Sequence, residues 1–131
     1  MNKGYLLFFL LLLIGPAEGY AQLKKLPPKP EVMPVFPGGT QSLYKYIYSN
    51  IKYPAEARKN GVSGTVSVEF MVDENGVLSD FLVVSGIGSG CDEEAIRVIK
   101  EMNIAHRWTP GKTNGEPVKA MFTLPVKFVL Q

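Results

Sequence analysis

The sequence predicts an α+β fold in which a small three-stranded antiparallel sheet carries helices on one face. Two strand-like segments, residues 65–72 and 77–86, are separated only by a short Asp-Glu-Asn-Gly turn, as in a β-hairpin. Helical patterns precede and follow this hairpin, and a third strand-like segment, residues 118–130, ends the chain. With 131 residues, 46% of them hydrophobic and 20% charged, the chain has the length and composition of one globular domain.

The first residues have the pattern of a secretory signal. Lys3 precedes an unbroken apolar run over residues 5–15, and the small residues Gly19 and Ala21 define a candidate cleavage site. The apolar run is about half of the roughly 20 residues that a membrane span requires. We therefore expect a signal peptide at residues 1–21 that exports the protein, with an uncleaved membrane anchor as the alternative.

Residues 22–37 are expected to form a proline-rich leader. Five prolines lie between Leu23 and Gly39, and each one lacks a backbone donor and biases the preceding residue toward extended geometry. We interpret this segment as a stiff, polyproline-like tether that leads into a folded domain at residues 38–131.

A first helix is expected over residues 40–51. Leu43, Ile47 and Ile51 repeat at i, i+4 and i+8 and so share one helical face. Thr40 follows two glycines and is a candidate N-cap.

A Tyr53-Pro54 pair then opens a second, shorter helix over residues 54–60. Proline suits a first helical turn because its missing N–H would have no partner there. Gly61 follows Asn60 and is the residue type preferred just after a helix.

The central hairpin has a clear inside and outside. Alternation predicts that one face of its first strand is buried, namely Val66, Val68, Phe70 and Val72. Asn75-Gly76 can adopt the positive φ values of a tight turn, and Leu78 is the inward candidate of the return strand.

A third helix is expected over residues 91–102, with Asp92 as its N-cap and Glu93 and Glu94 near the positive end of its dipole. Its predicted buried stripe consists of Ala95, Ile96, Val98, Ile99 and Met102. We expect residues 103–117 to form a loop, because prolines and glycines interrupt them.

Pairing rules place the last strand at the edge of the sheet. An antiparallel third strand must lie beside the first strand, since beside the second it would run parallel, and the predicted order is therefore 2-1-3. Pro125 supports this placement because proline within a sheet is confined to edges and bulges. The unpaired backbone of such an edge is a template for another chain.

The sequence offers little for chemistry. His106 is the only histidine, and Cys91 is the only cysteine, so neither a histidine cluster nor an internal disulfide can form. We expect no enzyme activity, no metal and no cofactor. The formal net charge of +2 does not favour nucleic acid as a partner.

Several short motifs follow one another in a family-specific order. They are Tyr53, Pro54 and Ala57; Gly64, Val66, Val68, Phe70, Val72 and Gly76; Val83, Ser85 and Gly86; Cys91 to Ala95; Trp108, Pro110, Gly111 and Lys112; and Phe122 to Phe128. Together they resemble the C-terminal domain of TonB-family energy transducers over about residues 31 to 131. Residues 33–54 resemble the extended form of the Bacteroidetes-type members.

The resemblance implies a periplasmic domain in energy-dependent transmembrane transport. Such a domain binds the TonB box of outer-membrane receptors by adding it as a strand to the last strand, and residues near the Tyr-Pro pair touch the receptor. Carried over, this nominates Tyr53, Pro54, Val118, Lys119, Ala120, Met121, Phe122, Thr123, Leu124, Pro125, Val126, Lys127 and Phe128. For Tyr53, packing in the core remains open as the alternative.

Two features differ from a force-transmitting family member. The apolar run has the pattern of a cleavable signal, and residues 22–37 span at most about 50 Å at roughly 3.3 Å per residue. An anchored form facing the periplasm would imply inner-membrane partners of the ExbB/ExbD type. The alternative function is a stand-alone interaction module, or a homodimer, that uses the same edge strand without energy transduction.

Overall fold

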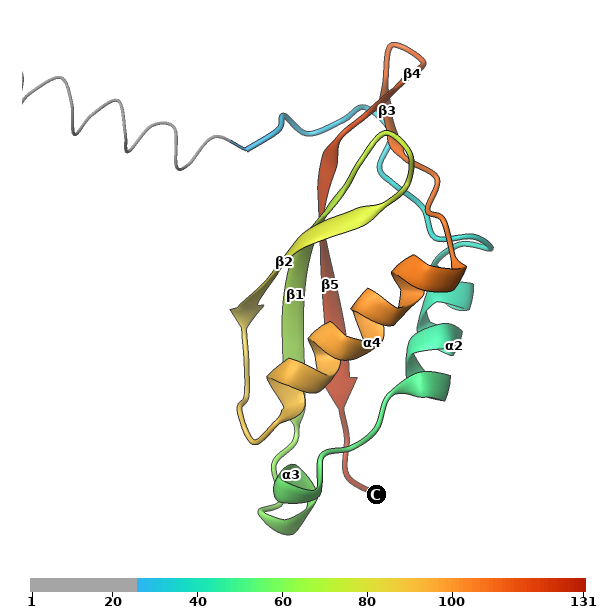
Figure 1. Cartoon of the computed structure of the whole chain (residues 1–131). Coiled ribbons are helices and arrows are strands. Elements are labelled where there is room, and N and C mark those ends of the chain that lie inside the picture. The colour runs from blue at the N-terminus through green and yellow to red at the C-terminus, as the bar shows by residue number, and fades with distance from the viewer. Residues whose placement is uncertain (1–25) are drawn as a thin grey trace, which may run out of the picture.

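The structure is a computed structural model that describes residues 26–131. Its elements are α2 (Thr40–Asn50), α3 (Ala55–Lys59), β1 (Gly64–Val72), β2 (Leu78–Ser85), α4 (Cys91–Ala105), β3 (Gly111–Thr113), β4 (Glu116–Val118) and β5 (Ala120–Phe128). Strands β2, β1 and β5 form an antiparallel sheet in that order, and α2 and α4 lie on one of its faces (Figure 1). The predicted fold class and strand order are confirmed. The predicted signal peptide, residues 1–21, lies outside the described residues.

Strand β1 is the centre of the sheet. It pairs with β5 in an unbroken register from Gly64–Phe128 to Val72–Ala120. Its pairing with β2 is irregular, because the register shifts twice and Asp80 adopts a φ of 55°. Both changes are typical of β-bulges, which bend a strand and strengthen its twist.

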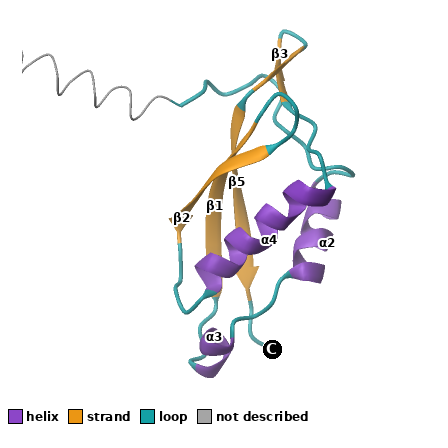
Figure 2. Ribbon diagram, in the orientation of Figure 1, coloured by secondary structure: helices purple, strands orange, loops and turns teal. Residues whose placement is uncertain are grey.

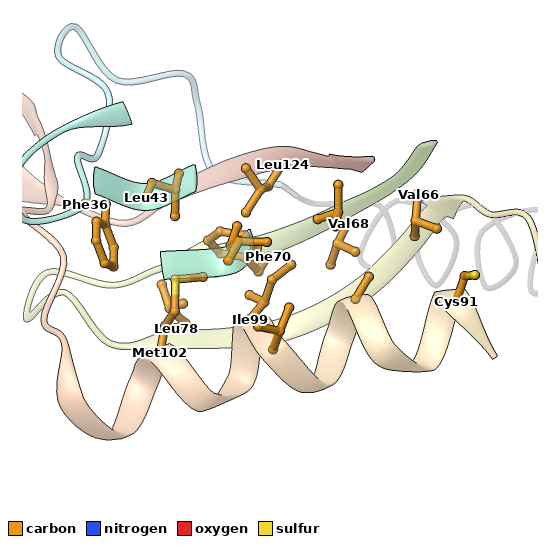
Figure 3. Close-up of a cluster of buried hydrophobic side chains, with 14 of the residues drawn as sticks. Phe36, Leu43, Val66, Val68, Phe70, Leu78, Cys91, Ile99, Met102 and Leu124 are labelled. Atoms are coloured by element: carbon orange, nitrogen blue, oxygen red, sulfur yellow. The ribbon is translucent and has the colours of Figure 1, made fainter. Parts of the chain in front are cut away.

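The core lies between the sheet and α4. The predicted inward residues of β1 are all buried, and so is Leu78 of β2. Ile99 and Met102 of α4 face them across the interface (Figure 3). Within residues 26–131, no helix combines the length and the apolar character that a membrane crossing requires.

Both predicted N-caps are wrong. Thr40 is the first residue of α2, and Gly39 occupies the cap position with a φ of 87°. Gly90 caps α4 with a φ of 86° and no side-chain bond. Asp92 lies inside the first turn, where its Oδ1 accepts hydrogen bonds from the N–H groups of Ile87 and Gly88 at 2.9 and 3.2 Å. This carboxylate therefore closes the glycine-rich loop ahead of the helix rather than capping the helix itself.

The predicted loop over residues 103–117 contains regular structure. Helix α4 continues to Ala105, and β3 pairs with β4 as a hairpin. Its turn residues Asn114 and Gly115 have φ values of 54° and 76°, the pattern of a type I′ turn. Figure 2 shows this hairpin at one end of the sheet and α3 at the other.

The leader is not a free tether throughout. Val32 and Val35 pair with Lys112 and Thr109 through backbone hydrogen bonds of 2.8–2.9 Å, so this segment adds to the outer side of β3. Phe36 is buried next to Trp108, with the two ring centroids 5.8 Å apart. The tether interpretation is therefore wrong for residues 32–36, which pack against the rest of the domain.

Two isoleucines of α4 give a matched test of this core. Ile99 is fully buried, whereas Ile104 is 87% exposed. We expect Ile99→Ala to lower the free energy of unfolding by about 2–5 kcal/mol, because it removes buried methylenes and leaves a cavity. Ile104→Ala should change it by less than about 0.5 kcal/mol. Urea unfolding of both variants measures the difference, and equal losses would contradict this packing.

Candidate partner-binding edge

The last strand forms one long edge of the three-stranded sheet. β5 pairs with β1 on one side only, as predicted. The edge is shorter than predicted, because Val118 belongs to β4 and Lys119 lies between the two strands. Four of its side chains face the core and are buried, namely Ala120, Leu124, Val126 and Phe128.

Hydrogen bonds show which backbone groups of β5 point away from β1. The Lys127 N–H donates to Tyr48 Oη at 3.1 Å, and the Pro125 carbonyl accepts from Tyr44 Oη at 3.4 Å. In an antiparallel pair, alternate residues direct both backbone groups to the same side. Met121 and Thr123 therefore also present their N–H and C=O groups on the outer edge. Pro125 falls in this outward set, so its missing donor costs the β1–β5 ladder nothing.

The outer edge has an open part and a covered part. Among residues 26–131, no hydrogen bond is found beyond β5 for the outward groups of Met121 and Thr123. Further along β5, Tyr44 and Tyr48 of α2 form hydrogen bonds with the outward carbonyl of Pro125 and the outward N–H of Lys127. Their rings stack on one another, with centroids 5.9 Å apart and an interplanar angle of 13°. Sequence reasoning missed this contact, although the i, i+4 spacing of Tyr44 and Tyr48 is visible in the sequence.

The Tyr44 hydroxyl remains a proton donor. Partial burial raises the pKa of Tyr44, and the nearby Tyr48 raises it further. The phenol is therefore neutral at physiological pH and can donate to the carbonyl of Pro125.

Tyr53 belongs partly to the core and partly to the surface. Its hydroxyl donates to the Val62 carbonyl, and its ring meets Phe128 edge to face with centroids 5.7 Å apart. The ring also borders a hollow of about 480 Å³, which Tyr48, Lys127 and Phe128 line as well. The structure thus places Tyr53 beside the end of the candidate edge. Pro54 lies apart from this hollow and abuts Gly90, where a Cβ would come within 3.1 Å of the proline ring.

A second hollow lies near the open part of the edge. Its volume is about 430 Å³, and Met121, Phe122 and Thr123 line it opposite the leader prolines Pro28 and Pro30. The two hollows therefore lie near opposite ends of β5.

Two charged residues of α4 hold the segment between α2 and Tyr53 in place. Glu94 accepts from the Lys52 N–H at 2.6 Å, and Arg97 donates to the Asn50 carbonyl at 3.0 Å. The two side chains form an ion pair of 2.7 Å, and Arg97 also contacts Glu101 at 2.9 Å. Sequence reasoning assigned Glu94 only to the helix dipole, because its partner segment lies 42 residues away in the chain.

Cys91 and His106 are packing residues. Cys91 is fully buried, and burial raises the pKa of its thiol, with Asp92 and Glu93 raising it further. The thiol is therefore not an activated nucleophile. His106 lies against the rings of Phe36 and Tyr46, at 5.2 and 5.0 Å between centroids. Across the described part of the chain, no group of three or more potential ligands is placed to hold a metal ion.

The class that this geometry defines is a small α+β domain with one sheet edge partly open for pairing. Residues 49–130 match the family model described as the C-terminal domain of the Gram-negative bacterial TonB protein. The chain therefore belongs to the TonB C-terminal family.

Individual relatives agree with this assignment. The chain is 31% identical to the protein TonB of Vibrio cholerae serotype O1 over 81 residues, which are 61% of this chain and 32% of that protein. The chain thus spans about a third of the length of this relative. Two solution structures of the Helicobacter pylori TonB C-terminal domain share the fold. For residues 194–285 the TM-score is 0.52 at 21% identity, covering 68% of this chain and 90% of the other. For residues 179–285 the TM-score is 0.53 at 22% identity, covering 70% of this chain and 79% of the other.

The Glu94 contacts predict a pH-dependent contribution to stability. Burial by itself raises the pKa of Glu94, but hydrogen bonds from Arg97 and from the Lys52 N–H outweigh it, so the pKa lies below its ordinary value of 4.5. The ionised form therefore stabilises the fold above the unfolded-state pKa, and this contribution disappears as the pH falls through the folded-state pKa. We expect Glu94→Gln to cost about 1–2 kcal/mol of unfolding free energy at neutral pH, and much less once the pH has fallen below the lowered folded-state pKa of Glu94.

The exposed neighbour Glu93 supplies the control for this prediction. Urea unfolding over a range of pH should show little effect of Glu93→Gln. A loss in Glu94→Gln that is the same at all pH values would contradict the ionic origin of the effect.

Proposed function

We propose that this domain binds the TonB box of an outer-membrane receptor by strand addition along β5, in energy-dependent transmembrane transport. Membership of the TonB C-terminal family supports this proposal, because TonB-family proteins are energy transducers and interaction modules of the cell envelope rather than known enzymes. The observation that carries it is the pair of outward, unbonded backbone positions at Met121 and Thr123.

These two positions suit an extended peptide. Each presents one N–H and one C=O, so an added strand gains up to four backbone hydrogen bonds without disturbing the β1–β5 ladder. Backbone pairing supplies affinity in this mode, and pockets beside the strand supply specificity. The hollow lined by Met121 and Thr123 can receive peptide side chains at this point.

The family assignment also supports a location and further partners. We propose that the domain acts in the periplasm, exported through residues 1–21. Were this segment retained as an anchor, ExbB/ExbD-type proteins of the inner membrane would be further partners. Self-association through the β5 edge is the competing function, and sedimentation at several protein concentrations separates it from receptor binding.

Thr123 is the position at which to test strand addition. Thr123→Pro removes an outward N–H that the β1 ladder does not use, and its ring blocks the approach of a strand. We expect it to weaken binding of a synthetic TonB-box peptide by about tenfold or more, since a lost hydrogen bond and a steric clash act together. Calorimetric titration measures the affinity, and circular dichroism confirms that the variant is folded.

Thr123→Val is the matched control, because it retains the N–H and the branched shape of threonine and should bind the peptide as the natural protein does. Nuclear magnetic resonance gives an independent readout of the same site. Strand addition would be excluded if the peptide left the β5 amide signals unshifted in the natural protein.

A further inference from the structure

We infer that the side chains of Tyr44 and Tyr48, carried by α2, form a removable cover on the β5 edge, and that their hydroxyls hold this cover in place. The inference concerns the regulation of the edge and rests on the proposed strand addition only for its consequence in binding. It follows from the way in which the two tyrosines meet the outward backbone of Pro125 and Lys127.

The spacing of the two elements matches. Four residues along a helix advance about 6 Å, at 1.5 Å per residue. Two residues along a strand advance about 6.7 Å. Tyr44 and Tyr48 are therefore in step with Pro125 and Lys127, and both pairs run in the same chain direction.

The hydrogen-bonding roles match as well. Tyr44 donates to the carbonyl of Pro125, and Tyr48 accepts from the N–H of Lys127. A neighbouring strand would likewise bring one N–H donor to the Pro125 carbonyl and one carbonyl acceptor to the Lys127 N–H. The tyrosines thus occupy the groups that an added strand would need, and Pro125 offers no N–H that could be left without a partner.

The two hydrogen bonds that hold the tyrosine cover are weak enough to break. Tyr48 is 46% exposed, and the Tyr44 contact of 3.4 Å is longer than the roughly 2.5–3.0 Å that is usual for an O–H···O hydrogen bond, so it is weak. An exposed neutral hydrogen bond of this kind shifts an equilibrium only about two- to tenfold. The helix itself stays anchored through its buried Leu43 and Ile47, so the two side chains can swing away while α2 remains packed.

Binding then proceeds in two parts. An incoming segment pairs first with Met121 and Thr123, whose outward groups are open. It extends to Lys127 only after the Tyr48 hydroxyl has left the Lys127 N–H. The hollow lined by Tyr48, Tyr53, Lys127 and Phe128 lies where the extended segment would end.

Two single variants test the cover in the free protein. We expect Tyr48→Phe to speed hydrogen exchange of the Lys127 amide by about two- to tenfold, because it removes the acceptor of that N–H. Tyr44→Phe is the matched control: its hydroxyl bonds to a carbonyl, so exchange at Lys127 should change little. The open Thr123 amide should exchange at the same rate in all three proteins.

Peptide binding tests the consequence. The double variant Tyr44→Phe/Tyr48→Phe should bind a synthetic TonB-box peptide more tightly than the natural protein, by about two- to tenfold for each lost contact. The bound peptide should also protect the Lys127 amide from exchange. A weaker affinity in the double variant would mean that the hydroxyls help to bind the peptide, and it would overturn the role as a cover.

The two proposals fail separately. Unchanged exchange at Lys127 in Tyr48→Phe overturns the cover, whatever the peptide does. Faster exchange at Lys127 in Tyr48→Phe supports the cover whether or not the peptide binds. If the peptide shifts no β5 amide signal in any variant, the proposed strand addition is overturned, but the cover is not.

Discussion

The register between β1 and β5 is the constraint on which the candidate site depends. In the observed register, Leu124 and Val126 face the core, and the missing N–H of Pro125 faces outward. A slip by one residue would turn both apolar side chains to solvent and place the proline donor gap inside the ladder. Burial and backbone pairing therefore select the same register. That register decides which backbone groups of Met121, Thr123 and Lys127 point to the outer edge of the sheet.

The core of the molecule is built from side chains, whereas the groups that β5 leaves unpaired toward its outer edge include backbone groups. Cys91 and His106 carry the side chains best suited to catalysis or metal binding. Cys91 is buried in the core, and His106 packs in an aromatic cluster with Phe36 and Tyr46. Apart from the exposed side chains of Thr123 and Lys127, the polar groups that β5 leaves available belong to the main chain. Recognition by strand pairing places few demands on partner sequence. If the domain recognises a strand in this way, a cover on part of the edge would limit unspecific pairing, including pairing with a second copy of the same chain.

Much of the fold follows from local patterns, whereas most of the site does not. Alternation within one strand identified the buried face of β1, and strand-pairing rules, supported by Pro125, placed the last strand at the edge. The caps were mispredicted because glycines with positive φ shape the chain before each helix, so that no side-chain cap is used. The Asn114-Gly115 turn was a readable hairpin signal that the surrounding prolines obscured. The Tyr48–Lys127 and Glu94–Lys52 contacts join distant segments, and no local pattern encodes them.

The docked leader changes the mechanics of the domain. Val32 and Val35 are bonded to the strand that follows Trp108, so a pull on the chain ahead of residue 26 reaches the β3–β4 hairpin before it reaches α2. Tension along the leader would therefore load the aromatic cluster around Phe36 while leaving the contacts of Tyr44 and Tyr48 with β5 unstressed. Only after these backbone pairs had ruptured would the same tension act on α2 and draw its hydroxyls from the edge. Under such a load, the backbone pairs of Val32 and Val35 would therefore have to break before the Tyr44 and Tyr48 contacts were strained.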